Sequence, residues 1–259
     1  MNFYDDEARI IESLQFVYNR KINYVNFSLK AWSFFLTLRS DVIFKDWVNS
    51  SGKDDPPPDF YSKKYKYMLE VMRVDDFVNG NQSPNALESV FLRNVENTLR
   101  ENGKPSLKEL NIQMLVIPNM ENASENNYVT YAENFRRVVK KHLEKIPDYR
   151  RNHPKYKLGF LVFDESAGYI QVEDPNKERK PGEKISGIRH SFFYDRRFIE
   201  VFEGQDLDFL IWMTPNKNLP ENPNVFPEVS VFDLKGHSRW KKRLMNFDCE
   251  KTVCWEARK

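Results

Sequence analysis

The chain contains little cysteine and little glycine. Of its 259 residues, 2 are Cys and 9 are Gly. Two Cys give no disulfide framework, so we expect a protein of the reducing cytoplasm. Cys249 and Cys254 have His237 nearby but lack a fourth zinc ligand, and we expect buried thiols. The scarcity of Gly leaves little room for a Gly-rich phosphate-binding loop.

Long apolar runs and a strong net charge are also missing. The longest apolar stretches, such as AWSFFLTL, are much shorter than the roughly 20 residues that cross a bilayer. The first residues, MNFYDDEARIIESL, carry acids where a signal peptide has a basic region. The 40 Lys and Arg nearly balance the 38 Asp and Glu, which excludes a uniformly basic coat but permits a local basic patch. We therefore expect no membrane partner.

Apolar and aromatic residues are abundant, at 40% and 14%, and predict a substantial core. The segment 156–172 is expected to form two strands around a turn at Asp164–Gly168, and the segment 22–48 is ambiguous between helix and strand. Further helices are expected at 5–19, 83–103, 126–146 and 196–203, and further strands at 59–61, 65–74, 111–118, 207–214 and 228–235. This order predicts a single domain, 1–259, of the α/β or α+β class, with a mixed central sheet flanked by helices.

The stretch PPPDFYSKKYKYMLEVMRVDD, residues 56–76, places a lone glutamate in an apolar strand. Side chains alternate along a strand, so Glu70 shares a face with Met68 and Met72. If the SKKY turn joins two adjacent strands, Asp59 and Glu70 converge. Two half-buried carboxylates repel unless a cation or a proton lies between them. Oxygen ligands of this kind suit Mg²⁺ or Mn²⁺, which can position a phosphodiester and ionise water.

The pattern PDF followed by EVM resembles the signature of the restriction-endonuclease-like nuclease superfamily, which reads Pro-Asp, a variable gap and then (Asp/Glu)-x-Lys. The resemblance implies a bacterial-type, Mg²⁺-dependent nuclease in which Asp59 and Glu70 are metal ligands. The family often adds a carboxylate from its first helix, and Glu7 is the candidate here. The element order, in which a helix and strands precede the acidic strand, agrees with that fold.

The lysine of the family signature is absent, because Met72 occupies its position. Lys66 lies on the same strand face four residues earlier and is the candidate replacement. Arg73 faces the other way, and its guanidinium cannot release a proton at neutral pH. A lysine supplied by a helix is another possibility. The competing interpretation is that Asp59 belongs to an ordinary turn and Glu70 to a cross-strand ion pair with Lys66, Arg73 or another base.

Two basic clusters are candidate DNA- or RNA-binding surfaces. The first lies on the expected helix 126–146 and the second in the segment KGHSRWKKR, where Trp240 can stack on a base. The competing interpretation is a solvated helix face and a partly buried Trp. The basic residues chosen are Arg136, Arg137, Lys140, Lys141, Arg239, Lys241, Lys242 and Arg243.

These observations leave three functions open. The first is a metal-dependent nuclease that uses Asp59, Glu70 and Lys66. The second is a catalytically inactive relative that binds nucleic acid, and the third is a protein-interaction module. Met72 favours the latter two. Asp164 and Glu165 are interpreted as turn residues, and Asp208 as a residue that caps a strand; the sequence predicts no oligomeric state.

Overall fold

The structure, a computed structural model, describes residues 7–17, 22–50, 58–75, 128–177, 186–214, 217, 228–236 and 243–254. The expected helix 83–103 and strand 111–118 lie outside these residues. Arg239, Lys241 and Lys242 lie outside them as well.

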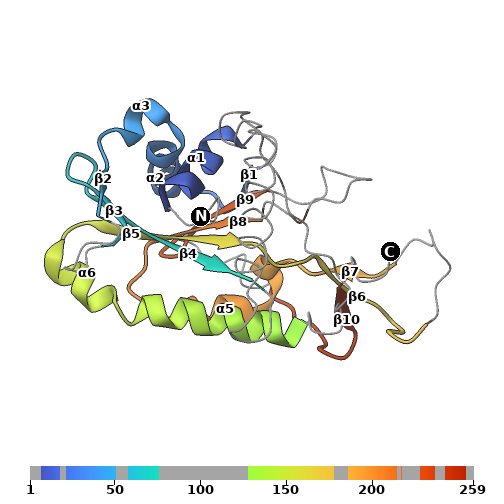
Figure 1. Ribbon diagram of the computed structural model, residues 1–259. Coiled ribbons are helices and arrows are strands. Elements are labelled where there is room, and N and C mark those ends of the chain that lie inside the picture. Colours follow the sequence, from blue (N-terminus) through green and yellow to red (C-terminus); the bar gives the residue numbers. More distant parts are fainter. Residues whose placement is uncertain are drawn as a thin grey trace, which may run out of the picture.

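A seven-stranded mixed sheet forms the centre of the described fold (Figure 1). Its strands lie in the order β1-β9-β8-β5-β4-β3-β2. Their bounds are β1 Ile22–Asn26, β2 Val48–Asn49, β3 Phe60–Ser62, β4 Tyr67–Val74, β5 Lys157–Asp164, β8 Phe209–Met213 and β9 Val229–Asp233. A three-stranded sheet, β10-β6-β7, lies beyond the carboxyl ends of β4 and β5. It consists of β6 Tyr169–Gln171, β7 Ile188–Arg189 and β10 Thr252–Cys254.

The central sheet combines two patterns of strand pairing. β2, β3 and β4 form an antiparallel meander. β4, β5 and β8 are parallel to one another. β9 runs antiparallel to β8, and β1 adds to it in parallel. A mixed α/β sheet is therefore confirmed.

Helices cover both faces of this sheet (Figure 1). One face carries α1 Glu7–Phe16, α2 Leu29–Arg39 and α3 Asp41–Phe44. The other carries α5 Tyr128–Leu143, α6 Ile146–Asn152, and the short helices η2 Phe192–Tyr194, α7 Arg196–Ile199 and η3 Glu200–Phe202. In the described part of the chain, no helix has the length and apolar character needed to cross a membrane.

Period-two alternation divides β4 between two apolar cores. Met68 and Met72 pack in the core beneath α5. Leu69 and Val71 pack in the core beneath α1 and α2. The predicted faces of this strand are confirmed, and Glu70 lies on the α5 face between the two Met side chains.

Apolar stripes on α1 and α5 also pack against the sheet. Ile10, Ile11 and Leu14 of α1 are buried. On α5, the buried residues include Tyr131, Phe135 and Val139 at helical spacing. The sheet leaves little room beneath α2, because a Cβ added at Gly159 of β5 would lie 2.2 Å from Cζ of Phe34.

Two expectations about elements need correction, and one ambiguous segment is assigned. The segment 156–172 is not a hairpin, because β5 belongs to the large sheet and β6 to the small one. The helix expected at 126–146 ends at Leu143, and α6 begins separately at Ile146 with Pro147 in its first turn. The ambiguous segment 22–48 forms β1, α2 and α3. Ser28 caps α2 by accepting a hydrogen bond from the N–H of Ala31.

Candidate active site

Asp59 and Glu70 meet at the β3–β4 hairpin. The pairing of Phe60 with Leu69 places the preceding residue, Asp59, opposite Glu70. The N–H of Asp59 donates to Oε2 of Glu70 at 3.3 Å, and the N–H of Val71 donates to Oδ2 of Asp59 at 2.7 Å. The backbone of each strand thus holds the carboxylate of the other.

The environment of this pair opposes a second negative charge. Glu70 is only 2% exposed. Burial, followed by the charge of Glu70, raises the pKa of Asp59 to about 7, and the charge of Glu7 contributes further. The N–H of Val71 and the charge of Lys145 oppose this shift. Near neutral pH, Asp59 therefore carries a proton in a large fraction of molecules unless a cation replaces it.

Two basic side chains from the helical face reach Glu70. Nδ1 of His142, near the end of α5, lies 2.6 Å from Oε1 of Glu70. Nζ of Lys145, in the turn between α5 and α6, lies 3.6 Å from the same oxygen. Lys145 is thus a lysine supplied from the helical side of the sheet. The sequence analysis considered such a lysine but did not identify which residue it is.

A buried tyrosine, Tyr149, also lies close to the carboxylate pair. Tyr149 of α6 is 1% exposed, and burial and then the charge of Glu70 raise its pKa above the ordinary value. Its hydroxyl faces Glu70, and hydrogen bonding to that carboxylate contributes to the raised pKa.

Sequence reasoning missed His142, Lys145 and Tyr149. Their spacings of three and four residues continue the apolar stripe of α5. A His on the partly buried side of α5, followed by a Lys three residues later, is a signal that this face contacts an acidic partner. Which strand carries that partner follows only from the fold.

The structure places the other predicted site residues less close to the pair. Glu7, at the start of α1, is near enough for its charge to act on Asp59. Lys66 is in the turn before β4 rather than in the strand, and its Nζ lies 5.1 Å from the ring centroid of Tyr156. Met72 is 3% exposed within the apolar core. Arg73 pairs with Glu165, with its Nη2 2.6 Å from Oε2.

The basic residues predicted on the long helix are exposed. Arg136, Arg137, Lys140 and Lys141 lie on the side of α5 opposite its buried stripe, and Arg243 is also exposed. This arrangement is compatible with a phosphate-binding surface and equally with a solvated face.

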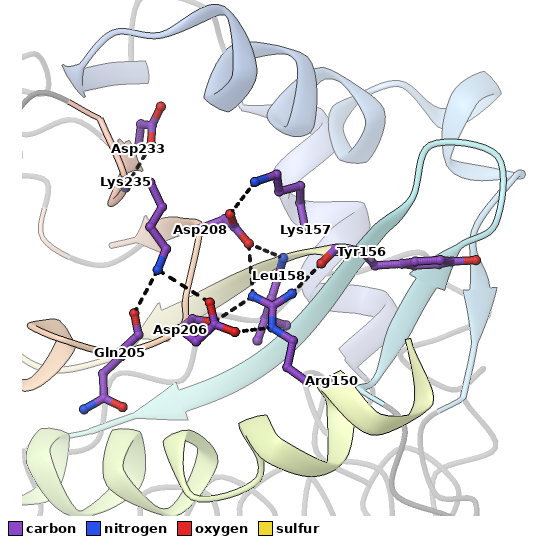
Figure 2. Close-up of polar contacts among 9 residues, drawn as sticks. All are labelled: Arg150, Tyr156, Lys157, Leu158, Gln205, Asp206, Asp208, Asp233 and Lys235. Carbon is purple, nitrogen blue, oxygen red and sulfur yellow. Dashed lines mark hydrogen bonds and ion pairs between the residues drawn. The ribbon is translucent and has the colours of Figure 1, made fainter. Parts of the chain in front are cut away.

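Ion pairs anchor α6 at the start of the parallel strands (Figure 2). Nε of Arg150 lies 2.6 Å from Oδ2 of Asp206, and its Nη2 lies 3.2 Å from Oδ2 of Asp208. Asp208 also accepts hydrogen bonds from the N–H of Leu158 at 3.0 Å and from Nζ of Lys157 at 2.9 Å. Asp208 therefore ties the strand starts and α6 together, which fixes the helix that carries Tyr149.

The interpretation of Asp164 and Glu165 as hairpin-turn residues was wrong. Asp164 is completely buried at the end of β5. Nζ of Lys217 lies 2.8 Å from its Oδ2, and Nε1 of Trp212 donates to the same oxygen at 2.9 Å. The hydroxyl of Tyr131 also donates to that oxygen. The Asp164 carboxylate is thus bound by side chains from α5, β8 and Lys217, and we interpret this cluster as structural.

The residues around Asp59 fit a divalent cation with few protein ligands. Within the described residues, no three His, Cys, Asp or Glu side chains are grouped closely enough to hold a metal ion. Two carboxylates nevertheless suffice for Mg²⁺, which commonly keeps several waters and takes its remaining ligands from a phosphate. The N–H of Val71 donates to Oδ2 of Asp59, so coordination of a cation would involve the other carboxylate oxygen, Oδ1.

Comparisons with protein-family models, with curated proteins and with solved structures give no match. The residues and their geometry are therefore the basis for any functional assignment.

Proposed function

We propose that this protein hydrolyses phosphodiester bonds of nucleic acid with the help of Mg²⁺ or Mn²⁺. The observation that carries the proposal is the buried pair of Asp59 and Glu70, in which burial and mutual charge raise the pKa of Asp59 to about 7. A divalent cation relieves this repulsion better than a proton does, because it interacts with both carboxylates at once.

Asp59 and Glu70 would hold the cation from neighbouring strands, and Glu7 would add negative charge to the site. A cation bound there supplies Lewis acidity toward a phosphodiester oxygen and lowers the pKa of water. The likeness to the restriction-endonuclease-like signature supports the same assignment.

Lys145 takes the role that the signature gives to the missing lysine. It reaches Glu70 from the helical side, at 3.6 Å, whereas Lys66 lies in the preceding turn with its amine over Tyr156. From this position the Lys145 ammonium can orient water or neutralise charge that develops on the phosphate. Tyr149 offers a further hydroxyl on the same side of the carboxylates.

The test is cleavage of labelled single-stranded and duplex DNA and RNA with Mn²⁺, with Mg²⁺ and with a chelator. Asp59→Asn preserves the size of the side chain and the acceptor for Val71, so the variant should fold like the wild type. A contaminating nuclease would be present equally in both preparations, and the variant therefore serves as the control. We expect metal-dependent cleavage by the wild type and none by Asp59→Asn. Calorimetric titration with Mn²⁺ gives a second measurement, and equal heats for the two proteins would contradict the proposal.

A second candidate function is nucleic-acid binding without hydrolysis. It is favoured by Met72 at the position of the signature lysine and by the contact of 2.6 Å between His142 and Glu70, which occupies a potential metal-ligand oxygen. This function requires that Mn²⁺ does not bind and that a chelator leaves nucleic-acid affinity unchanged. The calorimetric titration therefore separates the two candidates.

A further inference from the structure

Three aromatic rings form a series beside the carboxylate pair. The ring centroids of Tyr61 and His153 are 4.6 Å apart, and those of His153 and Tyr156 are 4.8 Å apart. Both pairs are inclined by 32°. All three side chains are partly exposed, and those of Tyr61 and Tyr156 also pack against the apolar core beneath α5.

The elements that carry this series also carry the candidate active site. Tyr61 lies two residues after Asp59, and alternation along a strand puts the two on the same face, roughly 7 Å apart along the chain. His153 follows Tyr149 by four residues at the end of α6, so it lies one helical turn further along the same side. The series therefore begins at Tyr61, two residues along the strand from Asp59.

Positive charge surrounds the rings. Nζ of Lys66 lies 5.1 Å from the ring centroid of Tyr156, and the charge of Lys63, after burial, lowers the pKa of His153. Lys155 is next to Tyr156 in the chain. All three lysines are exposed, and none forms an ion pair with an acid in the described part of the chain. By contrast, Lys64 pairs with Asp46 at 2.6 Å.

We propose that Tyr61, His153 and Tyr156, with Lys63, Lys66 and Lys155, bind single-stranded nucleic acid next to the carboxylate pair. Aromatic faces bordered by basic residues are the combination by which proteins hold unpaired bases and their phosphates. A duplex hides the faces of its bases, so it gains only the contacts of the lysines. The inference rests on the proposed function for the place of cleavage, but binding itself requires neither metal nor hydrolysis.

Binding is measured by fluorescence anisotropy in a chelator, with labelled oligothymidylate, oligouridylate and a duplex of the same length. We expect the wild type to bind both single strands at least about fivefold more tightly than the duplex, since stacking of one base is worth that much or more. Comparison of the two single strands distinguishes DNA from RNA. Equal affinity for single strands and duplex would overturn the inference, and so would a lack of binding at low salt.

Two pairs of variants locate the surface. Lys63→Glu/Lys66→Glu should weaken oligothymidylate binding at least tenfold and reduce its salt dependence. Arg136→Glu/Arg137→Glu makes the same charge change on α5 and should alter affinity less than about threefold, because it touches only non-specific attraction. If the α5 pair proves the more damaging, the inference is wrong.

A third variant tests whether the aromatic rings contribute to binding. His153→Leu/Tyr156→Leu keeps apolar volume but removes the stacking faces, and should weaken single-strand binding at least fivefold without changing duplex binding. Unchanged single-strand binding would refute the inference, and the lysine pair remains decisive if this variant fails to fold. Glu12→Gln, on the exposed side of α1, should bind oligothymidylate as the wild type does. If the wild type binds single strands but cleaves no substrate, only the proposed hydrolysis is refuted. If it cleaves duplex and shows no preference for single strands, only this inference is refuted.

Discussion

Asp59 and Glu70 hold each other through backbone rather than through their own charges. The N–H of Asp59 donates to Glu70, and the N–H of Val71, the residue after Glu70, donates to Asp59. These two hydrogen bonds fix the carboxylates side by side although their charges repel. The fold therefore stores an electrostatic cost at this hairpin, which a proton or a cation reduces.

The stored cost should appear in the pH dependence of stability. The pKa of Asp59 is about 7 in the folded protein and near 3.8 when unfolded. Between these values the folded state binds more protons, so its stability contribution falls as pH rises from about 4 to about 7. Asp59→Asn removes this loss. Its stability relative to the wild type should rise across that window by at most roughly 4 kcal/mol.

Urea unfolding at several pH values in a chelator measures this difference. Glu12→Gln, on the exposed side of α1, is a matched control and should show no such trend. A constant difference between Asp59→Asn and the wild type from pH 4 to pH 8 would show that the carboxylates do not interact as described.

Lys145 should matter to catalysis more than other lysines of the helical layer. Removal of a group that orients water or stabilises developing charge costs on the order of a hundredfold or more. We expect this loss in Lys145→Ala and little change in Lys141→Ala, whose side chain is exposed on α5. Rates of oligonucleotide cleavage with Mn²⁺ provide the comparison, and similar rates for both variants would exclude the role given to Lys145.

Met72→Lys tests the likeness to the nuclease signature directly. Position 72 lies on the same face of β4 as Glu70, two residues further along. In the Lys145→Ala background, a lysine at this position should restore part of the lost cleavage. Burial in a site that is 3% exposed should also destabilise the protein by a few kcal/mol. A folded double variant that remains as inactive as Lys145→Ala would count against the resemblance.

The buried pair of Lys217 and Asp164 should be important for stability. Lys217→Met leaves the Asp164 carboxylate without its cation and should cost about 3–5 kcal/mol, because an uncompensated buried charge remains. Adding Asp164→Asn should recover much of that loss. Lys235→Met, which removes an ion pair of 3.5 Å with Asp206 at the surface, should cost no more than about 1 kcal/mol. Chemical unfolding of the three variants checks this order.

Gly159 is required by the ring above it. Gly159→Ala brings a methyl group within 2.2 Å of Phe34, which itself stacks on Phe209 with ring centroids 4.7 Å apart. Overpacking of this kind should destabilise by about 1–3 kcal/mol. Phe34→Leu should make the alanine tolerable, so the double variant should be more stable than the sum of the single changes predicts. Additive losses in thermal unfolding would contradict this contact.

Local periodicity predicted much of the fold, because it determines which side of a strand or helix is apolar. The alternation around Glu70 is a property of a short segment, and the faces of that strand were predicted correctly. The meeting of Asp59 and Glu70 followed from the same reasoning, since a short turn joins their strands. Aromatic residues of 22–48 suit both helix and strand, so that segment needed tertiary contacts to be assigned.

Contacts between distant segments were beyond such reasoning. The segment after Asp164 has the pattern of a hairpin, but pairing of β5 with β4 and β8 takes both of its edges. The partnership of Asp164 with Lys217 joins residues 53 positions apart. Likewise, the arrival of His142 and Lys145 at Glu70 depends on how far α5 runs back along the sheet, which no local pattern specifies.

The edge strand β1 has a consequence for how the chain acquires this structure. Ile22 pairs with Val229, so the first strand finds its partner only in the last part of the sequence. Closing so long a loop is slow, and during synthesis β1 must wait for its partner strand until residues 229–233 have left the ribosome. Truncation before residue 228 would leave both β1 and the outer side of β8 unpaired, and exposed edges of that kind are a route to aggregation.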